Sequence, residues 1–232
     1  MTWRDVVRAI GGSWRASMGD IVFGVEDGAV SIFGLVVGVA AVSANSQAVL
    51  LAGATGAMAA AVSMMAGTYL DAQSVRDRWQ AELADERTRI AADPLTEQAK
   101  VDRRLLEVGF TTAEAQVVAG ALQRNPVAML EFATTSRLSA VRPSQDAPWT
   151  HALWMFVANL CAASIPVIPF AFYPLEAARL ISLTVTTLLL LGLGVWRGIV
   201  ARRNPAVTAA QTLAVAAVAA AAGIAVGRLV TG

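Results

Sequence analysis

The amino-acid sequence predicts an all-α membrane protein, with five transmembrane helices and a cytoplasmic helical insert between the second and third. Of its 232 residues, 56% are hydrophobic and 15% are charged, whereas soluble domains carry about 25% charged residues. The mean hydropathy is +0.57. The charges are concentrated at residues 71–142, and long uncharged stretches lie on both sides of this block. This pattern is typical of membrane spans with one solvated insertion.

Five segments are long enough to cross about 30 Å of hydrocarbon, which requires roughly 20 helical residues. The expected spans are residues 21–44, 47–70, 151–173, 177–195 and 206–229. Asn45-Ser46 and Tyr173-Pro174 predict tight turns between spans, and the polar residues 202–205 predict a short loop before the last span.

Four regions follow from this assignment: an amphipathic N-terminal segment at 1–20, two spans at 21–70, the insert at 71–149 and three spans at 150–232. Residues 1–19 mix arginines with short apolar runs. They therefore do not resemble a cleavable signal peptide, which needs a longer apolar core.

Charge asymmetry predicts the orientation of the spans. If five spans alternate in direction, every Lys and Arg except Arg179 and Arg228 falls on the same side of the membrane. The positive-inside rule makes that side the cytoplasm. We therefore expect the N-terminus and the insert in the cytoplasm and the C-terminus outside.

Four helices are expected in the insert. Pro94 ends the first, because a proline disfavours helical geometry in the residue before it. Gly109 suits the end of the second, Thr111 and Glu114 have the spacing of a capping box that opens the third, and Asn125-Pro126 opens the fourth. The expected helices are 71–92, 96–108, 111–123 and 125–138, with a linker at 140–148.

The composition excludes several classes of function. The single cysteine, Cys161, excludes an internal disulfide and thiolate clusters, and the single histidine, His151, argues against a histidine-rich zinc site. The formal net charge of +1 gives no reason to expect a nucleic-acid partner. No nucleophile–base pair or cofactor motif is present, so we do not expect an enzyme. Both His151 and Cys161 are interpreted as ordinary interface and packing residues.

Acidic residues in the first span are the main candidates for function. They are Asp20, Glu26 and Asp27. An ionisable side chain costs at least about 2.5–3.5 kcal/mol at the bilayer centre and usually faces a cavity, a partner or an ion path. Glu26 and Asp27 are neighbours, so they point in different directions around the helix and cannot both face lipid comfortably. The alternative is that the acids, Asp20 above all, reach the headgroups at the cytoplasmic interface.

Two methionines of the second span, Met64 and Met65, form a second set of candidates. The thioether sulfur is a soft ligand that suits transition metals. The alternative is that these side chains simply fill space between helices.

Acidic side chains of the insert form a third set. Glu82 and Glu86 are four residues apart on one helix face, so both carboxylates are able to reach the same divalent ion. Glu97, Glu131 and Met129 are further candidate ligands. The alternative is a solvated surface with salt bridges, because arginines are interleaved with these acids.

Three motifs resemble those of the vacuolar iron transporter family. The run Phe23–Ser31 (FGVEDGAVS) resembles the signature of its first span. Ser63–Leu70 (SMMAGTYL) and Ile165–Phe170 (IPVIPF) are similar to motifs of the second and third spans. The resemblance covers nearly the whole chain.

The resemblance implies a dimeric five-span fold with a cytoplasmic metal-binding domain. It implies export of Fe²⁺, and often Mn²⁺, from the cytosol in exchange for protons. Asp27 matches the acid of the family's Asp-Gly motif in the translocation path, and Met64 or Met65 matches a Ser-Met element that contacts the ion. Ala60 and Thr68 occupy places where many members carry a glutamate.

The resulting hypothesis is a homodimeric Fe²⁺ or Mn²⁺ exporter in a lipid bilayer of bacterial inner-membrane type, with no tightly bound cofactor. Asp27, helped by Glu26, would bind the ion, and Glu82, Glu86 and Glu131 would collect it. The alternative is a relative that does not transport and serves as a membrane-anchored metal-binding or partner-binding module. The reduced number of acids in the second span and the insert favours that alternative.

Overall fold

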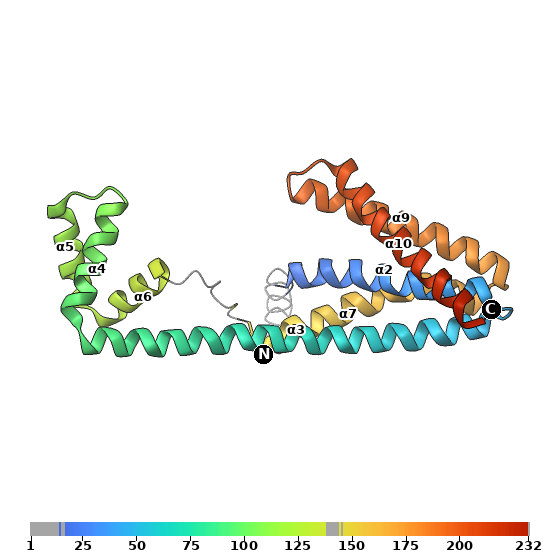
Figure 1. The fold of residues 1–232 in the computed structure, drawn as a ribbon, viewed down its shortest axis with the longest axis horizontal. Coiled ribbons are helices and arrows are strands. Elements are labelled where there is room, and N and C mark those ends of the chain that lie inside the picture. Colours follow the sequence, from blue (N-terminus) through green and yellow to red (C-terminus); the bar gives the residue numbers. More distant parts are fainter. Residues whose placement is uncertain (1–13, 15–16, 138–143, 145, 232) are drawn as a thin grey trace, which may run out of the picture. The chain divides into compact units, whose positions relative to one another are not determined.

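Helices make up all the regular structure in the described part of this chain (Figure 1). The structure, a computed structural model, describes residues 14, 17–137, 144 and 146–231. Two compact units are present: residues 1–70 with 146–232, here called the bundle, and residues 71–145, here called the insert unit. The all-helical prediction is confirmed. Most of the predicted N-terminal segment and of the linker at 140–148 lies outside the described residues.

Among the residues that the structure describes, five helices are long and apolar enough to cross a membrane. At a rise of 1.5 Å per residue, about 20 residues reach across the hydrocarbon layer. The five helices are α2 (Met18–Val42), α3 (Ser46–Ala92), α7 (Pro148–Val167), α9 (Leu175–Val200) and α10 (Pro205–Thr231).

Most helix boundaries lie within a few residues of the expected ones, with α9 ending at Val200 rather than Val195, and two larger differences change the arrangement of the helices. The second span and the first insert helix form a single helix, α3, because no proline interrupts residues 46–92. The third span, expected to continue to Tyr173, ends at Val167 and is followed by the short helix α8 (Pro169–Phe172). Pro169 has no N–H to continue the hydrogen-bond pattern. Ser182 of α9 donates to the Pro166 carbonyl at 2.7 Å, so a neighbouring helix binds a carbonyl group close to this break.

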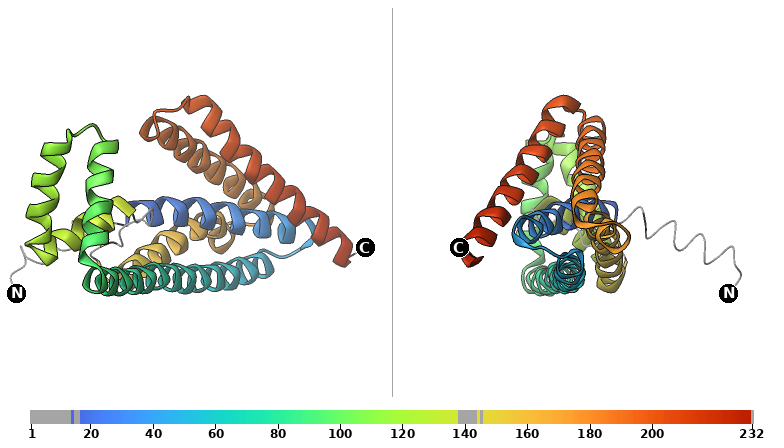
Figure 2. Two further views of the ribbon diagram at one scale, coloured as in Figure 1. Left: turned by 60° about the vertical axis from the view of Figure 1, so that its left-hand side comes forward. Right: turned by 90° about the vertical axis from the view of Figure 1, so that its right-hand side faces the viewer.

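α2 is the central helix of the bundle and packs against α7, α9 and α10 (Figures 1 and 2). Its contacts with α7 and α10 are made through glycines. Gly24 and Gly28 lie against α7, and Gly34 and Gly38 lie against Ala219 and Gly223 of α10, respectively. Small residues four apart let helix backbones approach closely in a membrane, where burial of apolar side chains gives little driving force.

The C-terminal end of α2 is bound by an arginine of α9. Arg179 donates through Nη2 to the carbonyl oxygens of Ala40 and Ser43, the latter at 3.2 Å. A cation is favourable here because the carbonyls at a helix C-terminus lack helical partners and carry partial negative charge. Arg179 is one of the two basic residues that were expected on the non-cytoplasmic side of the membrane, and this contact gives it a structural role.

The insert unit contains α4 (Pro94–Glu107), α5 (Thr112–Gln123) and α6 (Pro126–Arg137). The predicted capping box is confirmed: the side chain of Thr111 accepts from the Glu114 N–H, and Glu114 accepts from the Thr111 N–H. Hydrogen bonds from Thr111 hold the pKa of the Glu114 carboxyl below its usual value. Gly109 ends the α4 segment with a φ of 103°, a conformation that favours glycine.

We expect Gly38→Ala to destabilise the bundle by about 1–3 kcal/mol, because the new Cβ would overlap the backbone of Gly223 and cores tolerate extra atoms poorly. Gly192→Ala is the matched control: it adds a methyl group to helix α9 where, among the described residues, no atom of another helix lies within 4 Å of the new Cβ. Thermal unfolding in detergent should show a lower Tm for the first variant only. Equal Tm values would contradict the close packing of α2 on α10.

Candidate functional site

The three acidic side chains of α2 have partners on three different helices. Asp20 and Asp27 contact α7, whereas Glu26 contacts α9 and α10. All three are partly buried. Glu26 and Asp27 are adjacent residues that reach different neighbours, as the angle of about 100° between successive helical residues requires.

Asp27 is bound by a neutral side chain. Nδ2 of Asn159 on α7 donates to its Oδ2 at 3.1 Å. Asn159 is fully buried, at 0% exposure. Gly28, the next residue on α2, lies so close to the Asn159 main-chain carbonyl that any side chain at position 28 would collide with it. The Asp-Gly pair therefore combines an acid with the small residue that lets α7 approach it.

Glu26 is held in an ion pair that the sequence did not reveal. Nη1 of Arg197 on α9 lies 2.5 Å from both of its carboxylate oxygens, and Oγ1 of Thr212 on α10 donates to Oε1 at 3.4 Å. In the sequence, Arg197 contributed only to the charge asymmetry. Its distance of 171 residues from Glu26 leaves no local pattern from which to predict the pair.

Asp20 contacts His151, which lies near the start of α7. Oδ2 of Asp20 lies 2.7 Å from His151 Nδ1, and Ser17 Oγ lies 3.3 Å from the same nitrogen. The other ring nitrogen, Nε2, is buried and has no hydrogen-bond partner within the described part of the chain. His151 was interpreted as an ordinary interface residue, but the structure gives it a specific acidic partner.

One face of α7 carries three side chains with possible metal-ligating atoms: a nitrogen, a sulfur and an oxygen, on successive turns. His151, Met155 and Asn159 are spaced four residues apart, so they lie on successive turns of the same face. Met155 is 3% exposed, and its sulfur lies against Gly24 of α2. This spacing is visible in the sequence as three residues at positions i, i+4 and i+8.

Met64 and Met65 are half-buried on α3. Two pairs of contacts define the antiparallel register of α3 on α2: Gly53 lies against Val36, and Gly56 lies against Leu35 and, less closely, Ile32. Continuing this register by about two turns brings Met64 to the level of residues 24–27 of α2.

The candidate ligands of the insert unit are in several different environments. Glu86 and Glu97 are buried at 4% and 3% exposure, with ion pairs to Arg89 at 2.8 Å and Lys100 at 2.6 Å. Met129 lies in the apolar core with Val101, Leu105, Ala115 and Ala119.

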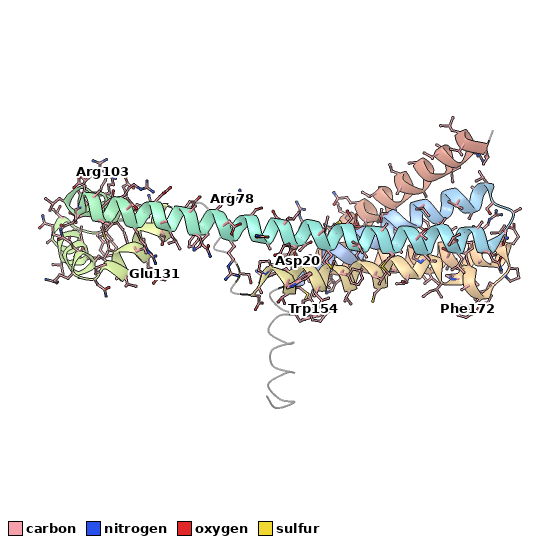
Figure 3. All side chains as sticks on the ribbon, turned by 90° about the horizontal axis from the view of Figure 1, so that it is seen from below. Asp20, Arg78, Arg103, Glu131, Trp154 and Phe172 are labelled. Carbon is pink, nitrogen blue, oxygen red and sulfur yellow. The ribbon has the colours of Figure 1, made fainter. Side chains whose placement is uncertain are left out.

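The remaining two candidates of the insert unit are less enclosed. One carboxylate oxygen of Glu82 is buried and has no hydrogen-bond partner among the described residues. Glu131 is exposed on α6 (Figure 3). Within the residues that the structure describes, no three His, Cys, Asp or Glu side chains gather closely enough to hold a metal ion. The insert ligands therefore stay a prediction.

Comparison with known proteins gives consistent matches. The sequence profile of the VIT family matches residues 18–228. Vacuolar iron transporter 1 of Oryza sativa subsp. japonica is 33% identical over 88% of this chain and 81% of its own length. Vacuolar iron transporter 1 of Arabidopsis thaliana is 32% identical over 91% of this chain and 85% of its own length. Protein CCC1 of Saccharomyces cerevisiae is 24% identical over 66% of this chain and 48% of its own length.

We expect Arg197→Gln to lower the free energy of unfolding by about 1–3 kcal/mol, because it leaves the partly buried Glu26 carboxylate without its cation. Glu26→Gln/Arg197→Gln should recover most of this loss, since both charges are then absent. Arg203→Gln, in the exposed turn after α9, is the control and should change little. Additive losses in the double variant, measured by thermal unfolding in detergent, would mean that the two side chains do not interact.

Proposed function

The chain belongs to the VIT family, and from this membership we propose that it is a divalent-metal transporter that moves Fe²⁺ or Mn²⁺ out of the cytosol. It is an integral membrane protein, and its described part contains five apolar helices of spanning length. The transported ion is its substrate.

The observation that supports this proposal best is the different pairing of the three acids of α2. Asp20 is paired with His151, which is able to carry a positive charge, and Glu26 is paired with Arg197. Among the described residues, the only hydrogen-bonding side chain found at Asp27 is the neutral amide of Asn159. An acid without a cationic partner inside a span attracts a mobile cation. Asp27 is therefore the proposed binding site in the transport path.

Glu26 and the methionines complete the proposed path. Glu26 is the neighbouring carboxylate, which becomes available to the ion when Arg197 moves away. Met64 or Met65 adds a sulfur ligand near the level of Asp27, and sulfur favours Fe²⁺ over Ca²⁺ and Mg²⁺. Protons that bind to the emptied carboxylates would return in exchange for the metal.

The proposed orientation follows from charge. The N-terminus and the insert unit lie in the cytoplasm and the C-terminus lies outside, in a membrane of bacterial inner-membrane type. In the insert unit, Glu82, Glu86, Glu97 and Glu131, with Met129, collect the ion before it enters the bundle. Glu86 and Glu97 must leave their ion pairs with Arg89 and Lys100 to do so.

A homodimer is the proposed assembly. An open apolar groove of about 520 Å³ runs along α2 and α10. Its walls contain several small residues, which allow a second helix to approach closely. Those on α2 and α10 include Gly34, Gly38, Ala219, Gly223 and Gly227.

Asp27→Asn should abolish metal uptake into liposomes that contain the purified protein, because it removes the carboxylate and leaves the size of the side chain unchanged. Asp71→Asn is the matched control, as Asp71 is exposed on α3, and it should transport at the parent rate. Fe²⁺ and Mn²⁺ are compared with a metal-sensitive dye inside the liposomes, under a proton gradient of either sign.

Two results of this experiment would change the proposal. Parent-like uptake by Asp27→Asn would remove Asp27 from the path. Absence of uptake by a well-folded parent would favour the non-transporting alternative, a membrane-anchored binding module.

Glu82→Gln/Glu86→Gln should raise the Mn²⁺ concentration for half-maximal uptake by about tenfold, equivalent to about 1.4 kcal/mol of lost binding. The maximal rate should stay unchanged, because the insert unit acts before the path. Glu107→Gln, which removes an exposed carboxylate paired with Arg104, is the control. A lower maximal rate with an unchanged half-maximal concentration would contradict a role in collecting the ion.

A further inference from the structure

We propose that Asn159 is a ligand of the transported cation, and that its side-chain oxygen and the Asp27 carboxylate bind the ion together between α7 and α2. The inference rests on the proposed function for the identity of the ion. It adds a residue from α7 to a path so far built from α2 and α3.

The side-chain oxygen of Asn159 has no hydrogen-bond partner among the residues that the structure describes. Its Nδ2 donates to Asp27 Oδ2 at 3.1 Å, while Oδ1 is buried and unpaired. The orientation of the amide is set by this bond, since the flipped amide would place two acceptor oxygens against each other. Buried polar atoms without partners are rare in folded proteins, and each costs about 1–3 kcal/mol.

Packing alone does not explain an amide at this position. The neighbouring buried residues of α7 are apolar, among them Ala158, Ala162 and Ala163. An apolar side chain would fill the space without leaving a carbonyl oxygen unpaired. Gly28 brings the Asn159 backbone unusually close to α2. The amide is thus held beside Asp27 at a cost in stability, which indicates a role in binding.

Rotation of the Asn159 side-chain amide would convert the ion-free arrangement, in which Nδ2 faces Asp27, into the ion-bound arrangement, in which Oδ1 faces the cation. The final torsion of an asparagine side chain is broad and roughly two-fold, so the amide group turns easily. Without an ion, Nδ2 faces the carboxylate and donates to it. With an ion, Oδ1 takes that position, and a carboxylate and an amide oxygen then face the cation together. Oxygen ligands of these two kinds suit divalent cations such as Mn²⁺.

An exchange of the two side chains tests this site. Asp27→Asn/Asn159→Asp keeps one carboxylate and one amide across the same contact, and a hydrogen bond of the same kind is able to form in the reverse direction. Mn²⁺ binding is measured on the purified full-length chain in detergent, from the electron paramagnetic resonance signal of free Mn²⁺. The Asp27-dependent site is the binding that Asp27→Asn loses.

We expect Asp27→Asn to weaken this site by about 100-fold and the exchanged variant to return to within about tenfold of the parent. Asn159→Asp alone should bind Mn²⁺ at least as tightly as the parent, because it keeps a ligand oxygen. Thr186→Val is the matched control: it removes another fully buried, unpaired oxygen, on α9, and should leave Mn²⁺ binding unchanged. Thermal unfolding shows which variants are folded.

Two results would overturn the inference. One is an exchanged variant that binds as weakly as Asp27→Asn, with Asn159→Asp also weakened, which would make Asn159 a donor that only positions Asp27. The other is a parent protein whose Mn²⁺ binding does not change when Asp27 is replaced by asparagine. A parent that binds this ion but fails to transport it would contradict the proposed function alone, because the exchange still tests the ligand.

Discussion

The close approach of backbones at the glycines of α2 is the contact on which the rest of the bundle depends. Gly24 and Gly28 admit α7, and Gly34 and Gly38 admit α10. In lipid, helices gain little from burying apolar surface, so short-range packing and interhelical hydrogen bonds must supply the association. Gly28 also determines which side chains meet: Asp27 accepts a hydrogen bond from Asn159 only while Gly28 keeps α2 and α7 close together.

The acids of α2 are distinguished by their surroundings rather than by their own chemistry. An arginine, a histidine and an amide are three different partners for three carboxyl groups on one helix. An ion pair with Arg197 of α9 occupies Glu26, and a hydrogen bond with His151 of α7 occupies Asp20, so both acids join α2 to neighbouring helices. A neutral partner orients Asp27 without cancelling its charge. The three carboxyl groups of a single helix therefore lie in three different electrostatic environments.

Local patterns predicted the helices well and their partners poorly. Hydropathy and length identified the spans, and capping residues identified the helices of the insert unit, because both signals lie within a short stretch of chain. The pairs Glu26–Arg197 and Asp27–Asn159 join residues more than a hundred positions apart, so they depend on the packing of whole helices. The third span was expected to continue to Tyr173, but its helix ends at Val167, close to Pro166 and Pro169.

Two arginines join α9 to α2 at opposite ends. Arg179 binds the carbonyls of Ala40 and Ser43 where α2 ends, and Arg197 binds Glu26 nearer to its start. While both contacts persist, α2 and α9 move together as one rigid unit. A transporter with this arrangement opens its path first to one side of the membrane and then to the other. It must therefore move α3 or α7 relative to this unit, or break both arginine contacts in the same step.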